Sequence, residues 1–188
     1  MRILLADDEA LIRMGLRAMI EDAGHQVVGA VTDGKSAVAM AQMVNPDLVI
    51  LDIKMPGMDG LEAARQIMAE RPTPIVMLTA YSQRELIEQA KAASVFAYLV
   101  KPVKEELLGP TLDLAMMRFK EWKALRQQAK DLQESLHARD LVERAKRALV
   151  EKEQLSEREA YLKIHRQSRA RRVPMHKVAE QILKKFGQ

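Results

Sequence analysis

The 188-residue sequence contains no cysteine, which excludes disulfide bonds and thiolate metal sites. Aromatic residues make up only 4%, and Tyr161 and Phe186 are the only ones after Trp122. The C-terminal part therefore lacks an aromatic stacking platform of the RRM or OB type. No apolar run approaches the ~20 residues of a membrane span, and acid appears at Asp7, too early for a signal peptide. We expect a cytoplasmic protein without membrane contact.

Charge is distributed unevenly along the chain. Residues 1–108 carry 11 Lys and Arg against 15 Asp and Glu, whereas residues 109–188 carry 19 against 11. The excess is concentrated in residues 163–188, where eight basic side chains face one acid, Glu180. With a hydrophobic share of 48% the chain can form a core. These figures predict two folded parts with different partners, the second binding a phosphate-rich polymer.

The first part alternates short apolar runs with amphipathic stretches, which predicts a doubly wound α/β fold with a five-stranded parallel sheet. The predicted strands are Ile3–Ala6, Val27–Ala30, Leu48–Leu51, Ile75–Leu78 and Ala97–Val100. The predicted helices between them are Leu11–Glu21, Ser36–Met43, Leu61–Ala69 and Gln83–Ala92.

Polar residues follow four of these strands directly. Asp7 and Asp8 follow the first, Asp52 the third, Thr79 the fourth and Lys101 the fifth. Any one of them could cap a helix or solvate a strand end. Together they meet at one edge of the sheet, where three carboxylates need a hard cation or a lysine for compensation. The set predicts a Mg²⁺ site for phosphoryl transfer, with an aspartate as acceptor.

Residues 1–120 resemble a response-regulator receiver domain, which has a flavodoxin-like fold. The resemblance rests on signals that occur in family order: Asp7-Asp8, Asp52 with Met55-Pro56-Gly57 and Asp59-Gly60, Thr79-Ala80, Tyr98, and Lys101-Pro102. One departure is Ala93-Ser94-Val95-Phe96, where the family usually has glycine before its fifth strand.

The resemblance implies a role for each matching residue. Asp52 would accept a phosphoryl group from a histidine kinase. Asp8, Asp52 and the backbone carbonyl of Lys54 would bind Mg²⁺, with Asp7 acting through water. Thr79 and Lys101 would contact the phosphoryl oxygens, and Tyr98 would be the aromatic switch residue, although an ordinary strand aromatic fits the sequence equally. The Lys101-Pro102 peptide is typically cis in this family.

An enzyme of the haloacid-dehalogenase type also uses an aspartate nucleophile, Mg²⁺, threonine and lysine. That family needs a second aspartate two residues after the nucleophile, where this chain has Lys54. We therefore expect a phosphoprotein rather than an enzyme: it modifies its own Asp52, with autodephosphorylation and no separate substrate.

After Pro102 the sequence predicts a long helix reaching about Lys152, with a kink or short break at Gly109-Pro110. Its apolar positions approach a heptad seam: Leu112, Ala115, Phe119, Trp122, Leu125, Ala129, Leu132 and Leu136. The seam predicts a coiled-coil linker over 111–138 and a phosphorylation-dependent homodimer through the helix of residues 112–136. The alternative is a helix that packs on its own domain.

Residues 139–188 are predicted to form a three-helix unit. Ser156 and Glu159 have capping-box spacing for a second helix, and Pro174 suits the first turn of a third, with Val178, Ile182 and Phe186 on its apolar face. The segments Ala145-Lys146, Leu149, Leu155-Ser156, Glu159-Ala160-Tyr161, Ile164 and Val178-Ala179 resemble the ANTAR domain of AmiR- and NasR-like regulators. This resemblance implies binding to structured RNA and control of transcription antitermination. Arg147 and Gln154 depart from the family, which often has small residues there.

Basic side chains of this unit are the candidates for RNA contacts: Arg144, Lys146, Arg147, Lys163, Arg166, Arg169, Arg171, Arg172 and Lys177. They can contact phosphates and stack on unpaired loop bases. A basic face that is merely solvated is the simpler interpretation. Two other outputs stay open, a DNA-binding helix-turn-helix and a signalling adaptor that acts through its coiled coil. A helix-turn-helix often has glycine in its tight turn, and residues 139–173 contain none.

Overall fold

The computed structural model describes residues 1–80 and 95–187. The chain separates into two compact units, Met1–Lys123 and Ala124–Gln188. The predicted helix at Gln83–Ala92 lies outside the described residues. Within the described ranges, no helix is both long enough and apolar enough to cross a membrane.

The first unit is built on a five-stranded parallel sheet in the order β2-β1-β3-β4-β5. The strands are β1 (Arg2–Ala6), β2 (Gln26–Val31), β3 (Leu48–Asp52), β4 (Ile75–Thr79) and β5 (Ala97–Val100). Every residue of β3 and β4 is buried, as expected for strands covered on both faces. The predicted doubly wound fold is confirmed. The chain reverses its winding direction at β1, so the carboxyl ends of β1 and β3 are adjacent.

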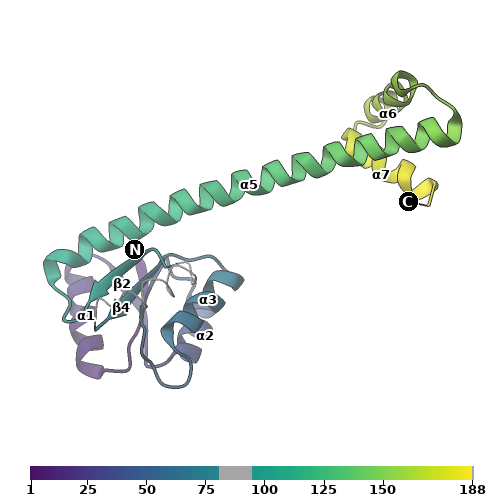
Figure 1. Cartoon of the computed structure of the whole chain (residues 1–188). Helices are drawn as coiled ribbons and strands as arrows, with labels where there is room; N and C mark the ends of the chain where they lie inside the picture. The colour runs from purple at the N-terminus through teal and green to yellow at the C-terminus, as the bar shows by residue number, and fades with distance from the viewer. Residues whose placement is uncertain (81–94, 188) are drawn as a thin grey trace. The chain divides into compact units, whose positions relative to one another are not determined.

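Helices cover both faces of this sheet. They are α1 (Ala10–Asp22), α2 (Gly34–Val44) and α3 (Gly60–Glu70), and α2 and α3 pack side by side on the face opposite α1 (Figure 1). Asp33 and Asp59 cap α2 and α3, because each side chain accepts a hydrogen bond from a backbone N–H of the first turn. The caps fix where each helix begins relative to the preceding loop.

Helix α5 (Glu105–Glu153) continues through Pro110, so a short break at Gly109-Pro110 is wrong and the kink stays a prediction. Pro110 lies in the second turn of α5, so its missing N–H deprives the carbonyl of Glu106 of the usual intrahelical hydrogen bond.

The predicted seam of α5 is divided between two roles. Leu112 and Ala115 are fully buried in the core of the first unit. Phe119 and Trp122 pack against Phe96, with ring centroids 5.3 and 5.9 Å from the Phe96 ring. This part of the seam packs on its own domain. The prediction that two chains pair along the whole of residues 112–136 is therefore wrong for the first half of the seam. Only the later positions stay open to solvent: Leu125, Leu132 and Leu136 are 66%, 63% and 58% exposed.

The second unit is a three-helix arrangement formed by the end of α5, α6 (Glu157–Arg171) and α7 (Met175–Lys185). Its core contains Ala145 and Leu149 from α5, Ile164 from α6 and Val178 from α7, all at most 1% exposed. The predicted capping box is confirmed: Ser156 and Glu159 each accept a hydrogen bond from the other residue's backbone N–H. Pro174 is the N-cap of α7 rather than a residue of its first turn.

Candidate functional site

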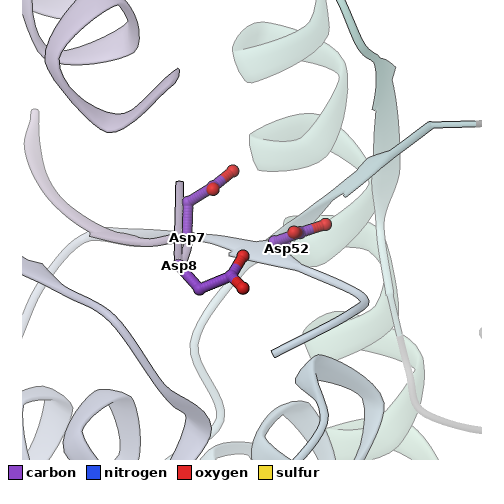
Figure 2. Close-up of side chains that lie close together, drawn as sticks. All are labelled: Asp7, Asp8 and Asp52. Atoms are coloured by element: carbon purple, nitrogen blue, oxygen red, sulfur yellow. The ribbon is translucent and has the colours of Figure 1, made fainter. Parts of the chain in front are cut away.

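Three aspartates converge at the carboxyl ends of the two central strands. Asp7 follows β1 directly and is fully buried, Asp8 is the next residue, and Asp52 ends β3 with a side chain that is 8% exposed. Each offers a carboxylate oxygen, and these three oxygens lie within 4.8 Å of one another (Figure 2). Because β1 and β3 are paired in parallel register, their ends place the carboxylates at one edge of the sheet.

Lys101 compensates part of this negative charge. Its Nζ lies 2.8 Å from Oδ2 of Asp7 and 2.8 Å from Oδ2 of Asp52. Burial alone would lower the pKa of Lys101, but the contacts with Asp52 and Asp7 outweigh it and raise the pKa above its ordinary value of 10.5. The ammonium therefore stays charged throughout the neutral range.

Desolvation is the main influence on Asp52. It raises the pKa of this carboxyl above 3.8, while the hydrogen bond and charge of Lys101 oppose the rise and the charge of Asp7 adds to it. A carboxylate that is buried beside another carboxylate is under-solvated and gains from additional positive charge. The site is therefore arranged to attract a cation or an electrophile.

The donor set fits a hard divalent cation. Oδ2 of Asp7 is buried and makes no well-directed hydrogen bond, although the ammonium of Lys101 is nearby, so the oxygen keeps coordination capacity. Carboxylate oxygens held by few residues are what Mg²⁺ uses when it retains water and open positions. The carbonyl of Lys54 stays a predicted ligand.

Mg²⁺ should raise the thermal unfolding midpoint of the chain, because an ion that binds only the folded state stabilises it by about 2.7 kcal/mol at a hundred times its dissociation constant. Asp8→Asn should reduce this rise, since it removes a predicted carboxylate ligand from an exposed position where the fold does not depend on it. The measurement is a Mg²⁺ titration followed by calorimetry. Asp113→Asn, an exposed aspartate on α5, is the matched control. An equal rise in all three proteins would place the ion elsewhere.

Thr79 and Tyr98 come from the two strands beyond β3. Thr79 ends β4 and is buried, and its carbonyl accepts a hydrogen bond from the backbone N–H of Lys101 at 2.8 Å. Tyr98 is half-buried on β5, and its desolvation raises the pKa of the phenol, with the charge of Arg118 acting in the opposite direction. The Lys101-Pro102 peptide is cis. The structure thus places Thr79 at the end of β4, Tyr98 on the adjacent β5 and Lys101 directly after β5, and their roles stay predictions.

Sequence reasoning assigned no role to three residues around this site, although it used Gly60 as part of the Asp59-Gly60 motif. Glu9 places Oε1 3.3 Å from Nζ of Lys101, as a further carboxylate on the same ammonium. Arg13 donates hydrogen bonds from Nη1 to the carbonyls of Asp7 and Asp8, at 2.7 and 3.3 Å. Arg13 therefore holds the backbone of the acidic pair. The only feature of the sequence that could have indicated this role is the position of Arg13, one turn after the start of α1.

Gly60 is the third of these residues. A Cβ at this position would lie 1.9 Å from the carbonyl oxygen of Asp52. Only glycine allows the start of α3 to approach the end of β3 this closely. Gly60 therefore allows Asp52 to lie directly against the start of α3.

The predicted RNA-contact residues of the second unit fall into two groups. Members of the first have partners on the same unit: Arg144 with Asp140 (3.9 Å), Lys146 with Glu143 (3.0 Å), Lys177 with Glu180 (3.1 Å), Lys163 with Glu153, and Arg171 with the Gln181 side chain. Members of the second are exposed and have no ion pair with any described residue: Arg147, Arg166, Arg169 and Arg172. The second group has its charge available for an external anion.

Comparison with known proteins identifies both units. Residues 3–113 match the family model of the response regulator receiver domain, and residues 130–183 match that of the ANTAR domain. The chain belongs to the ANTAR-type response regulators. The transcriptional regulatory protein PdtaR of Mycobacterium tuberculosis is 47% identical over 186 residues, which cover 99% of this chain and 91% of that protein.

Other relatives of this response regulator share the receiver domain. The chemotaxis protein CheY4 of Vibrio cholerae has a solved structure that is 36% identical, with a TM-score of 0.56, covering 60% of this chain and 95% of that one. A protein-glutamate methylesterase/protein-glutamine glutaminase of Archaeoglobus fulgidus is 42% identical over 105 residues, but these cover only 30% of that enzyme. The match to the enzyme is limited to the receiver domain, and the receiver and ANTAR domains fit a regulator without catalysis of its own.

Proposed function

We propose that a histidine kinase phosphorylates this response regulator on Asp52 and that the modified chain controls transcription antitermination by binding structured RNA through its ANTAR domain. The observation that supports the first step most directly is the contact of Lys101 with the carboxylates of Asp7 and Asp52, both at 2.8 Å. The under-solvated carboxylate of Asp52 therefore lies beside one ammonium, that of Lys101, and within a cluster of acidic side chains.

In the proposed transfer, an oxygen of Asp52 attacks the phosphorus of a phosphohistidine. A bond between carboxylate oxygen and phosphorus forms, the bond between nitrogen and phosphorus breaks, and its electron pair returns to the imidazole, which takes up a proton. Asp8, Asp52 and the carbonyl of Lys54 would hold Mg²⁺, with Asp7 acting through water. When bound, this ion supplies charge stabilisation for the phosphoryl oxygens. Lys101 and Thr79 would bind the remaining oxygens.

Phosphorylation should favour a dimer through the exposed part of the α5 seam, since Leu125, Leu132 and Leu136 present apolar side chains that the receiver core leaves uncovered. Sedimentation should show more dimer when Mg²⁺ and a phosphoryl mimic are bound at Asp52. A difference of ~1–3 kcal/mol between the two states is sufficient for a useful switch.

Leu132→Gln should remove this shift at little cost to the monomer, because the side chain is 63% exposed. Leu107→Gln is the matched control, since Leu107 is 52% exposed on α5 but lies outside the seam. An unchanged mass with and without the mimic, at every concentration, would exclude the seam as the element that responds to phosphorylation.

RNA binding is tested by filter retention of the full chain with a pool of RNA hairpins that have randomised loops, and with duplex DNA. We expect retention of hairpins that share a loop sequence, and weaker retention of the duplex. The exposed arginines without ion pairs support this expectation, because arginine contacts both phosphates and unpaired bases. Tighter binding to duplex DNA would favour a helix-turn-helix output, and retention of neither nucleic acid would favour a signalling adaptor.

A further inference from the structure

Tyr161 is the only tyrosine of α6, and much of its side chain is open to solvent. Ala160, the preceding residue, and Ile164, one turn later along the helix, are fully buried in the core of the second unit. Tyr161 is nevertheless 45% exposed. The core therefore does not use much of its ring, and this ring surface is available to a binding partner.

His165 extends the ring surface of Tyr161. The two rings are stacked, with centroids 6.1 Å apart and planes inclined by only 16°. Residues four apart are neighbours on a helix surface. Tyr161 and His165 therefore form one parallel ring pair on which a further planar group can stack.

Arginines lie at both ends of this surface along α6. Arg158 is one turn before Tyr161, and Arg169 is one turn after His165, so all four residues share one side of the helix. Both arginines are exposed and make no ion pair with any described residue. The acids of α6 are confined to its first turn, and one of them, Glu159, is engaged in the capping box. The ring pair is thus flanked by positive charge that no described ion pair compensates.

We infer that Tyr161 and His165 form a stacking surface for one unpaired base of an RNA loop, and that Arg158 and Arg169 bind the phosphates on either side of that base. This inference rests on the proposed RNA binding. Unpaired bases are recognised by stacking on tyrosine, histidine and arginine side chains, and positively charged side chains nearby bind the phosphates of the backbone. A protein partner would find an apolar surface of only two rings between repelling arginines. The arrangement favours a nucleotide.

The test uses the full chain and one synthetic RNA hairpin, selected for binding to the wild-type protein from the pool with randomised loops. Tyr161→Ala should weaken binding by about 5- to 150-fold, the usual effect of removing one base–aromatic stack. The salt dependence should stay unchanged, because the arginines that bind phosphates are all retained. Tyr161→Phe keeps the ring and should bind like the wild type. Equal unfolding midpoints would show that both variants are folded.

The hairpin provides the complementary variation. Loop nucleotides are replaced one at a time by abasic residues, and one replacement should weaken binding to the wild type while causing no further loss with Tyr161→Ala. If the loss caused by the abasic residue and the loss caused by Tyr161→Ala multiply at every loop position, no base stacks on Tyr161. Wild-type affinity in Tyr161→Ala, or an equal loss in Tyr161→Phe, would also overturn the inference. If the wild type retains no hairpin, the proposed RNA binding fails, and the stacking surface fails with it.

Discussion

Asp52→Asn should abolish acid-labile phosphorylation of the chain by a small phosphodonor in the presence of Mg²⁺. The substitution replaces the nucleophilic carboxylate oxygen with an amide, whose oxygen and nitrogen are poor nucleophiles, and it keeps the shape of the side chain. The fold should survive, because the ionised carboxylate is already disfavoured by desolvation at this position. Intact mass under neutral conditions, compared with mass after acid treatment, measures the acyl phosphate.

Asp113→Asn is the matched control for this experiment, because it makes the same chemical change at an exposed position on α5. It should be labelled like the wild type. Undiminished labelling of Asp52→Asn would move the phosphoryl acceptor to another residue, and peptide mapping would then distinguish Asp7 from Asp8. Absence of labelling in both variants would indicate a general effect of reduced negative charge.

Replacing Arg166, Arg169 and Arg172 together with glutamine should produce the other large effect, a decrease in RNA affinity with a flatter salt dependence. On single-stranded RNA, each phosphate that the protein no longer neutralises removes about 0.7 from the slope of log K against log salt concentration, so three such phosphates remove about 2. The three arginine charges are available for phosphates because none has an ion pair with a described residue. Binding measured over a salt series gives the slope directly.

The matched control replaces Lys104, Lys120 and Lys123, which are exposed in the first unit, and changes the net charge by the same amount. It should leave the slope unchanged. Weaker binding by the arginine variant with an unchanged slope would mean that these arginines do not meet phosphates. A lower slope in both variants would mean that net charge alone controls the affinity.

Much of the receiver fold could be predicted because its strands are buried on both faces and therefore occur as continuous apolar runs in the sequence. The acidic site followed from the same fact, since the first polar residues after such runs meet at one sheet edge. The contacts of Glu9 and Arg13 could not be predicted, because they depend on how α1 is oriented against that edge. Sequence spacing fixes a residue's side of a helix but not the direction of the helix.

The apolar face of α5 illustrates the limit of periodicity. The spacing from Leu112 to Leu136 predicts a continuous seam, yet its first half packs on the receiver domain, where Phe96 provides a complementary surface. A heptad pattern predicts an apolar face on the helix, but it does not predict which surface packs against that face. The same limit applies to the basic residues, because the pairing of Lys163 with Glu153 depends on the tertiary contact between the end of α5 and the middle of α6.

Trp122, the only tryptophan of the chain, lies in the cluster formed with Phe96 and Phe119. Phe96 immediately precedes β5, the strand that carries Tyr98 and leads to Lys101. The emission of this single indole therefore reports on one place, the packing of α5 against the strand next to the phosphoryl site. The chain carries its own fluorescent probe there, and we expect the proposed phosphorylation to be detectable on the unmodified protein without an attached dye.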